Sequence, residues 1–180
     1  MEPRIAQIVV MGVAGSGKTT VATHLSARLG CELADADDFH PQANIAKMAA
    51  GIPLQDEDRW PWLEAIAAWI RARAQARHTA VVTCSALKRA YRDVLRAASA
   101  EVVFVHLSGT PELIAERMRS RHGHFMPPAL LASQLATLEP LAPDEPGLTV
   151  NVARSPAQLA EEIVTALGLA PAQAPGPAGA

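Results

Sequence analysis

A short glycine-rich run near the N-terminus has the residue types and spacing that bind nucleotide phosphates. Residues Gly12 to Thr19 have the sequence GVAGSGKT, which fits the pattern G-x-x-x-x-G-K-[ST]. Glycines let the backbone curl so that successive N–H groups face a phosphate, and a following helix directs its positive end at the same anion. Lys18 would then bridge the terminal phosphates, and the Thr19 hydroxyl would contact Mg²⁺. An apolar run before the motif and a helical pattern after it favour this P-loop over a chance glycine-rich turn.

Two aspartates follow at the end of the next expected strand. On an extended segment, Asp35 and Asp37 are two residues apart and point to the same side, while Asp38 points elsewhere. Ligands of an open α/β sheet bind at the carboxyl ends of its strands. One of the two could therefore hold Mg²⁺, and the other could accept a proton from a substrate hydroxyl; the functional role is favoured for Asp37 because it follows a P-loop. The alternative is an Asp-rich turn that caps the next helix, and for Asp38 capping would be the only role.

Polar side chains farther along could line the site of a second substrate, the phosphoryl acceptor. His40, Lys47 and Arg59 lie in a segment with little regular pattern, which suits a cover over that site. Each of them taken singly is explained equally well as solvated surface. Lys88 and Arg92 are four residues apart on the helix expected after the third strand, so one helix face could present both cations to an anionic acceptor.

Several arginines stand at the C-terminal end of the helix expected at residues 111–121. Those that close over a transferring phosphoryl group stabilise the charge on its oxygens. Cations at a helix C-terminus are favourable without any such role, which is the alternative. Arg117 and Arg121 share a helix face and are predicted to contact the nucleotide, whereas Arg119 is predicted to be surface.

Strands and helices alternate along the chain. Apolar runs predict strands at residues 5–11, 31–34, 80–84, 102–107 and 148–152. Helical spacing predicts helices at residues 18–29, 62–76, 87–97, 111–121, 129–138 and 157–167. This order is typical of right-handed βαβ units in an α/β fold with a doubly wound parallel sheet, here one domain over residues 1–169. Residues 170–180 are rich in Ala and Pro and predict a disordered tail.

Charge and composition exclude several classes of protein. The chain has 180 residues, 16 Lys plus Arg against 18 Asp plus Glu, and a net charge of −2. It therefore lacks an overall basic field that would attract nucleic acid or a membrane surface. No apolar run approaches the roughly 18 residues of a membrane span, and no secretory leader is visible, so we expect a cytoplasmic protein. Cys31 and Cys84 are too far apart for a disulfide framework and are predicted to be reduced core thiols.

A P-loop alone does not distinguish a kinase, a GTPase and a motor ATPase, but the other motifs do. An Asn-Lys-x-Asp motif is absent, which disfavours a switch GTPase. Together, the P-loop and the runs DDFHP at residues 37–41, CSALK at residues 84–88 and HFMP at residues 124–127 resemble the thermoresistant-type gluconokinases of the P-loop kinase class. The matching stretches span most of residues 5–165.

The resemblance implies ATP-dependent phosphorylation of D-gluconate on its terminal hydroxyl, with Mg²⁺. It also implies a three-layer αβα sandwich around a five-stranded parallel sheet, similar to shikimate and nucleoside monophosphate kinases. An acceptor region at about residues 38–62, a lid at about residues 117–130, an adenine loop at residues 151–156 and a homodimer would belong to this arrangement.

Site residues follow from the same resemblance and the patterns above. The catalytic residues would be Lys18, Asp37 and Arg121, and the metal ligands Thr19 and Asp35. ATP would meet Gly12, Val13, Ala14, Gly15, Ser16, Gly17, Lys18, Thr19, Thr20, Arg117, Arg121, Arg154 and Pro156. Gluconate would meet Asp37, His40, Lys47, Arg59, Lys88 and Arg92, which offer cations for its carboxylate and polar groups for its hydroxyls.

Two alternatives stay open at this point. Another acceptor, such as shikimate or a nucleoside monophosphate, would keep the chemistry; shikimate kinases would be expected to have a glycine-rich loop where this chain has CSALK at residues 84–88. A non-catalytic ATP-binding module would bind ATP without transfer, and the presence of every catalytic part disfavours it.

Overall fold

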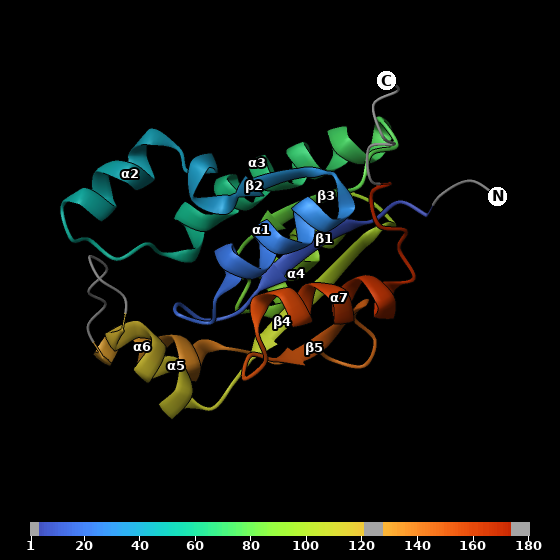
Figure 1. Cartoon of the computed structure of the whole chain (residues 1–180). Coiled ribbons are helices and arrows are strands. Elements are labelled where there is room, and N and C mark those ends of the chain that lie inside the picture. The colour runs from blue at the N-terminus through green and yellow to red at the C-terminus, as the bar shows by residue number, and fades with distance from the viewer. Residues whose placement is uncertain (1–3, 121–127, 174–180) are drawn as a thin grey trace, which may run out of the picture.

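A parallel five-stranded sheet forms the centre of the computed structural model, which describes residues 4–120 and 128–173 (Figure 1). The strand order is β2-β3-β1-β4-β5, and every neighbouring pair is parallel. The strands are β1 Gln7–Met11, β2 Glu32–Asp35, β3 Ala80–Thr83, β4 Val102–Ser108 and β5 Gly147–Asn151. The doubly wound sheet predicted from the apolar runs is confirmed.

Helices cover both faces of this sheet, as the three-layer prediction requires. They are α1 Lys18–Leu29, α2 Gln42–Ala49, α3 Asp56–Gln75, α4 Arg89–Arg96, α5 Pro111–Arg119, α6 Pro128–Thr137 and α7 Pro156–Leu167, with a 3-10 turn η1 Ala36–Phe39. Helices α1 and α7 pack on one face and α3 and α4 on the other. Ile8 and Val10 belong to the first core and Val9 and Met11 to the second, because successive strand residues point to opposite faces.

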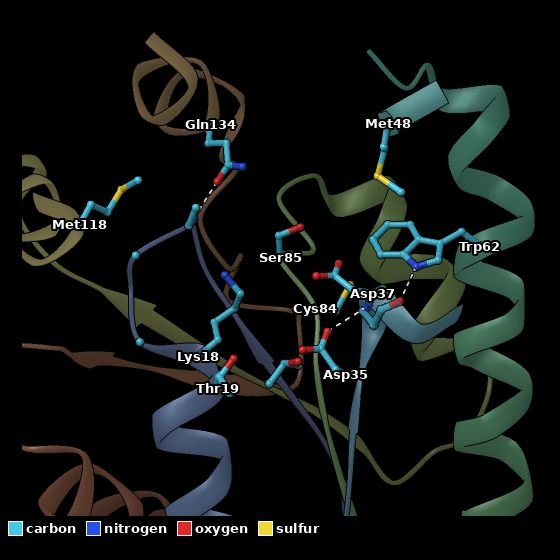
Figure 2. Close-up of a pocket in the computed structure, with 15 residues that line it drawn as sticks. Lys18, Thr19, Asp35, Asp37, Met48, Trp62, Cys84, Ser85, Met118 and Gln134 are labelled. Carbon is cyan, nitrogen blue, oxygen red and sulfur yellow. Dashed lines mark hydrogen bonds between the residues drawn. The ribbon is translucent and has the colours of Figure 1, made fainter. Parts of the chain in front are cut away.

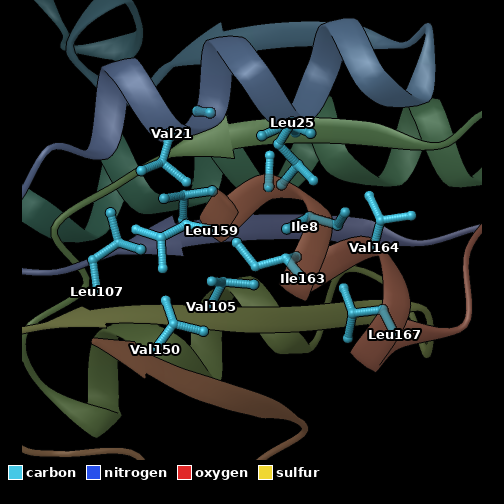
Figure 3. Packing of buried hydrophobic residues seen from close by; sticks show 14 of the residues in the cluster. Ile8, Val21, Leu25, Val105, Leu107, Val150, Leu159, Ile163, Val164 and Leu167 are labelled. Carbon is cyan, nitrogen blue, oxygen red and sulfur yellow. The ribbon is translucent and has the colours of Figure 1, made fainter. Parts of the chain in front are cut away.

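The core between the sheet and helices α1 and α7 fixes the base of the P-loop. Figure 3 shows Val21 and Leu25 of α1 and Leu159 and Ile163 of α7 gathered with Ile8 on one face of the sheet. These side chains are buried. The helix that follows the P-loop is therefore held rigidly against the strand that precedes it.

Two elements depart from the sequence prediction in the acceptor region. Helix α2 was not expected, because its one buried residue is Asn44 while Ile45 and Met48 are exposed, so the segment has no apolar stripe. Helix α3 begins at Asp56 rather than at residue 62. A capping box formed by Gln55 and Asp58 begins the helix before Pro61. Because proline is typical of the first helical positions, the sequence pattern places the helix start close to Pro61.

The structure describes the first residues of the predicted disordered tail, up to residue 173. The backbone N–H of Ala172 donates to the carbonyl of Arg28 at 2.9 Å, so the chain after α7 lies against the end of α1. Residues 174–180 lie outside the described residues. Within the described ranges, no helix has both the length and the apolar character needed to cross a bilayer.

Candidate active site

A cavity of about 550 Å³ opens at the carboxyl ends of β1, β2 and β3. It is lined by the P-loop, by the segment after β2 and by the segment after β3, and Met48, Met118 and Gln134 close it from α2, α5 and α6. Figure 2 shows Lys18 and Thr19 on one side of this cavity and Asp35 and Asp37 on the other. The structure therefore brings together the four residues for which the sequence predicted phosphate, metal and proton-transfer roles.

The P-loop backbone is shaped to hold an anion. Gly12 has a φ of 147°, and a Cβ there would lie 2.9 Å from the Leu107 carbonyl oxygen, so no side chain fits. No side chain caps α1, whose N-terminal N–H groups therefore remain directed at the cavity. The Lys18 ammonium donates to the carbonyls of Gly12 and Val13 at 3.0 and 3.1 Å, which places it beside the position where phosphates would bind.

The two aspartates share the cavity for a different reason from the one predicted. The chain is not extended through Asp37 but turns into η1, and the Asp37 N–H donates to Asp35 Oδ1 at 2.9 Å. The capping role considered for Asp38 thus belongs to Asp35. Desolvation and the neighbouring Asp35 charge raise the pKa of Asp37, while His40 and Lys18 oppose that rise. A carboxylate with a raised pKa is a better proton acceptor.

This raised pKa predicts a pH dependence of catalysis. In the role predicted for it, Asp37 would accept a proton only when ionised, so kcat/KM for the acceptor should fall as the pH drops through the pKa of Asp37, and the fall should begin above the ordinary aspartate value of 3.8. The measurement is a profile of kcat/KM at saturating ATP between about pH 4 and pH 8. The residual activity of an Asp37→Asn variant should lack this acidic limb; an unchanged limb in that variant would assign the titration to another group.

An aromatic pair supports the acceptor side of the cavity. Trp62, a cavity-lining residue, donates from Nε1 to the Ala36 carbonyl at 2.7 Å. The His40 ring stacks on Trp62 with centroids 4.5 Å apart, and Asn44 lies 3.2 Å from His40 Nδ1. Trp62 is buried in the core between the sheet and helices α3 and α4, and its ring also orients His40.

Three predicted acceptor-site cations lie in an outer cluster and do not line the cavity itself. Lys47 contacts both carboxylate oxygens of Asp58 at 2.8 Å. Arg59 donates to Asp56 at 3.0 Å, and Lys88 lies 3.7 Å from the same carboxylate. The hydrogen bond from Lys47 is the main cause of a lowered pKa at Asp58. Each cation is thus held in place by an α3 carboxylate.

The buried position of Arg92 contradicts the prediction that Lys88 and Arg92 form a cationic helix face toward the acceptor. Lys88 is the N-cap residue of α4, and Arg92 is buried, with 1% of its side chain exposed. Its guanidinium group donates to both carboxylate oxygens of Glu145 at 2.6 and 2.9 Å. It also donates to the Ala86 carbonyl at 2.9 Å, in a loop where Ala86 adopts a φ of 45°. Arg92 therefore holds the loop after β3 in place and does not reach a substrate.

The lid residues are placed in part. Arg117 of α5 donates to the carbonyl of Val152, a residue of the predicted adenine loop. Arg154 pairs with Glu162 at 2.7 Å on the surface, and Pro156 is the first residue of α7. Arg121, which was predicted to be catalytic, lies outside the described residues.

Some cavity residues were not singled out from the sequence. Gln134 of α6 accepts a hydrogen bond from the P-loop N–H of Ala14 at 2.7 Å, and Ser85 lines the cavity beside Cys84. No local sequence pattern marks Gln134, which lies within the long span of residues 5–165 that resembles the family. Cys84 is a free cysteine buried in the core, which confirms the prediction of a packed thiol, and this burial raises the pKa of the thiol to about 12.

Comparison with known proteins identifies the family. Residues 8–141 match a family described as an AAA domain. A gluconokinase of Gluconobacter oxydans (strain 621H) is 48% identical over 164 residues, which cover 91% of this chain and 91% of the relative. The chain belongs to the gluconokinase family. The resemblance seen in the motifs is thereby confirmed, and with it a kinase activity.

Solved structures agree with this membership of the gluconokinase family. A sugar kinase from Janibacter sp. HTCC2649 is 54% identical with a TM-score of 0.85, covering 93% of this chain and 96% of that chain. A gluconokinase from Sinorhizobium meliloti 1021 is 43% identical with a TM-score of 0.82, covering 93% and 94%. Shikimate kinase from Aquifex aeolicus, at 16% identity and a TM-score of 0.57, shares the fold alone.

Proposed function

We propose that this chain catalyses the ATP-dependent phosphorylation of D-gluconate on its terminal hydroxyl, giving 6-phosphogluconate. One observation carries the proposal: Lys18 and Asp37 line one cavity in a chain that aligns with a gluconokinase over 91% of its length. Lys18 supplies a cation for the terminal phosphates, and Asp37 supplies a proton acceptor opposite it. These are the two groups that direct transfer of a phosphoryl group to a hydroxyl.

On the nucleotide side, the P-loop N–H groups and the start of α1 would receive the phosphates of ATP. Lys18 would move from the P-loop carbonyls that it now contacts to the phosphate oxygens. Arg117 and Arg121 would close over the nucleotide from the lid, and Arg154 and Pro156 would lie along the adenine. The contact of Arg117 with the Val152 carbonyl supports this arrangement, because it joins the lid helix to the adenine loop.

The donor set suits Mg²⁺. This ion is usually held by one or two protein oxygens together with phosphates and water. Thr19 and Asp35 provide such oxygens in the cavity, and within residues 4–120 and 128–173 no three His, Cys, Asp or Glu side chains form a self-sufficient metal site. When bound, Mg²⁺ would neutralise phosphate charge. Thr19 and Asp35 would hold it beside Lys18.

On the acceptor side, Asp37 would accept the proton of the terminal hydroxyl. Gluconate is an anion with several hydroxyls, so its remaining groups require a cation and polar side chains. His40 stacks on Trp62, which lines the cavity, and Lys47, Arg59 and Lys88 lie in the outer cluster. The gluconate carboxylate would compete with the α3 carboxylates for these cations. Arg92 has no part in this site because it is buried against Glu145.

A panel of acceptors tests this function. ADP release from Mg-ATP should depend on gluconate, with phosphate appearing on its terminal oxygen. Shikimate and nucleoside monophosphates should give no more than the background rate. Absence of gluconate-dependent ADP release would overturn the proposal, and ATP binding without turnover on any acceptor would favour a non-catalytic module.

Lys47→Met is expected to raise the KM for gluconate at least about tenfold, since a lost charge-assisted hydrogen bond costs roughly 1.5–3 kcal/mol. The KM for ATP should remain unchanged because Lys47 lies on the acceptor side. Steady-state kinetics with each substrate varied in turn measures both values. Arg28→Met is the matched control, since Arg28 pairs with Glu161 between α1 and α7, away from the acceptor region. An unchanged KM for gluconate in Lys47→Met would remove Lys47 from the site.

The cellular location, the oligomeric state and the binding partners form a further part of the proposal. We infer a cytoplasmic homodimer that binds neither nucleic acid nor membranes. The net charge of −2 supports the absence of polyanion binding. The homodimer is an expectation from the family resemblance, and the cytoplasmic location is an expectation from the sequence. Light scattering at several protein concentrations tests the dimer; a single mass near the 19.0 kDa of one chain would contradict it.

A further inference from the structure

Gln134 joins the lid side of the cavity directly to the P-loop. Its carboxamide oxygen accepts the backbone N–H of Ala14 at 2.7 Å, although the two residues are 120 positions apart in the chain. Both residues line the cavity that holds Lys18, Asp35 and Asp37. The side chain therefore lies beside the P-loop, in the cavity that would hold the terminal phosphate and the acceptor.

The chemistry of this hydrogen bond fixes the orientation of the amide. A backbone N–H can only donate, so the atom that receives it must be the carboxamide oxygen, and the amide nitrogen must point the other way. Figure 2 shows this nitrogen turned away from Ala14, toward the open space above Lys18 and Ser85. The –NH₂ group carries two N–H donors, which Gln134 thus presents to the cavity.

Helix α6 holds this amide on a rigid support. Leu131, one turn before Gln134, is buried in a small core with Val13 of the P-loop and Leu87 of the loop after β3. Just beyond the helix, Glu139 donates from its N–H to the Leu87 carbonyl at 2.7 Å and accepts the Arg89 N–H at 2.7 Å. The helix is therefore seated against both the P-loop and the loop after β3, so the amide keeps its position without reorganisation.

The electrostatics of the cavity favour a neutral donor at this position. Phosphoryl transfer spreads negative charge over three oxygens, and preorganised donors aimed at those oxygens lower the barrier. Lys18 serves them from the P-loop side, while Asp35 and Asp37 face them from the other side with charges of the same sign. An amide donates to the phosphoryl oxygens without adding a cation that would pair with Asp37.

We propose that Gln134 is a further catalytic residue: Ala14 anchors its amide oxygen, and its amide N–H groups donate to an oxygen of the phosphoryl group during transfer. This proposal rests on the proposed gluconate kinase function. In the step, the bond between the γ-phosphorus and the oxygen that it shares with ADP breaks, and a bond forms to the terminal oxygen of gluconate. The hydroxyl proton goes to Asp37. Gln134 exchanges no atom and contributes hydrogen bonds alone.

Two substitutions at Gln134 test the proposal. Gln134→Glu keeps an oxygen for the Ala14 N–H and replaces the donor by a second carboxylate oxygen, while Gln134→Met keeps the length of the side chain without donor or charge. Both should lower kcat at least about a hundredfold, the usual effect of removing one such donor. The KM for gluconate and the dissociation constant of Mg-ATP should change by less than about threefold, because the donor acts mainly during transfer. Ser133→Ala, at an exposed neighbouring position on α6, should keep full activity.

The possible outcomes separate this proposal from others. Full kcat in Gln134→Met would overturn it, as would a rise in KM or in the dissociation constant of ATP with kcat unchanged, which would make Gln134 a ground-state anchor of the P-loop. Loss of kcat in Gln134→Glu alone would also overturn it, since that result reports repulsion by a carboxylate. Melting temperatures of all variants show whether each one folds. Wild-type turnover with gluconate is measured first, so a failure of the kinase function itself is recognised separately.

Discussion

Replacing Asp37 by asparagine should lower kcat for gluconate phosphorylation at least about a hundredfold while leaving ATP binding nearly intact. Asparagine fills the same space but cannot accept the hydroxyl proton. The P-loop, Lys18 and Thr19 are untouched by the change, so the affinity for nucleotide should persist. Single-turnover kinetics measures the transfer step, and calorimetric titration with a non-hydrolysable ATP analogue measures binding.

Stability and a neighbouring residue provide the controls for Asp37→Asn. The folded-state pKa of Asp37 is raised, so its ionised form disfavours the folded state at neutral pH, and the asparagine variant should be at least as stable as the wild type. Asp38→Asn changes the next residue of the same turn and should keep normal turnover. Equal activity in Asp37→Asn and Asp38→Asn would remove Asp37 from the role of general base.

Replacing Arg92 by methionine should destabilise the fold by about 3–5 kcal/mol, the usual cost of removing one partner of a buried ion pair. The side chain of Glu145 is only 1% exposed, so its carboxylate would be left buried without its cation. The carbonyls of Ala86 and Leu87 would lose a donor as well. Urea denaturation followed by circular dichroism measures the free energy of unfolding.

Two further variants show whether the Arg92 effect comes from the unpaired charge. Arg92→Met combined with Glu145→Leu removes both charges and should recover most of the lost stability, because buried pairs can often be replaced by apolar residues at little cost. Arg89→Met breaks an exposed pair with Asp144 between the same two segments and should leave the urea midpoint nearly unchanged. A similar loss in Arg89→Met and Arg92→Met would show that burial of the pair does not matter.

Local sequence signals explain which parts of the structure could be predicted. Helix α1 has the predicted bounds because Gly17 and Gly30, both with left-handed φ, flank it. Helix α7 begins at Pro156, one residue from its predicted start, because Ser155 caps it. Asp35 and Asp37 were placed correctly in the cavity because parallel strands bring their carboxyl ends to one edge of the sheet.

The features that could not be predicted depend on contacts between distant segments. Helical spacing put Lys88 and Arg92 near each other but could not show that Arg92 faces inward, because its partner Glu145 is 53 residues away. The Ala14 hydrogen bond to Gln134 spans 120 residues. Helix α2 has no apolar stripe because it packs against no core; its Met48 lines the cavity, and its one buried residue is Asn44.

The construction of α2 has a consequence for access to the active site. This helix is described throughout its length, and none of its residues belongs to the hydrophobic clusters that pack against the sheet. Its buried anchor is Asn44, which donates a hydrogen bond to the Asp58 carbonyl at 2.8 Å, and the partly exposed Lys47 adds an ion pair with the Asp58 carboxylate. Segments held by so few buried groups open at a small fraction of the global unfolding free energy. A local, sub-global opening of α2 would therefore admit an acceptor to the cavity, while the sheet that carries the P-loop stays folded.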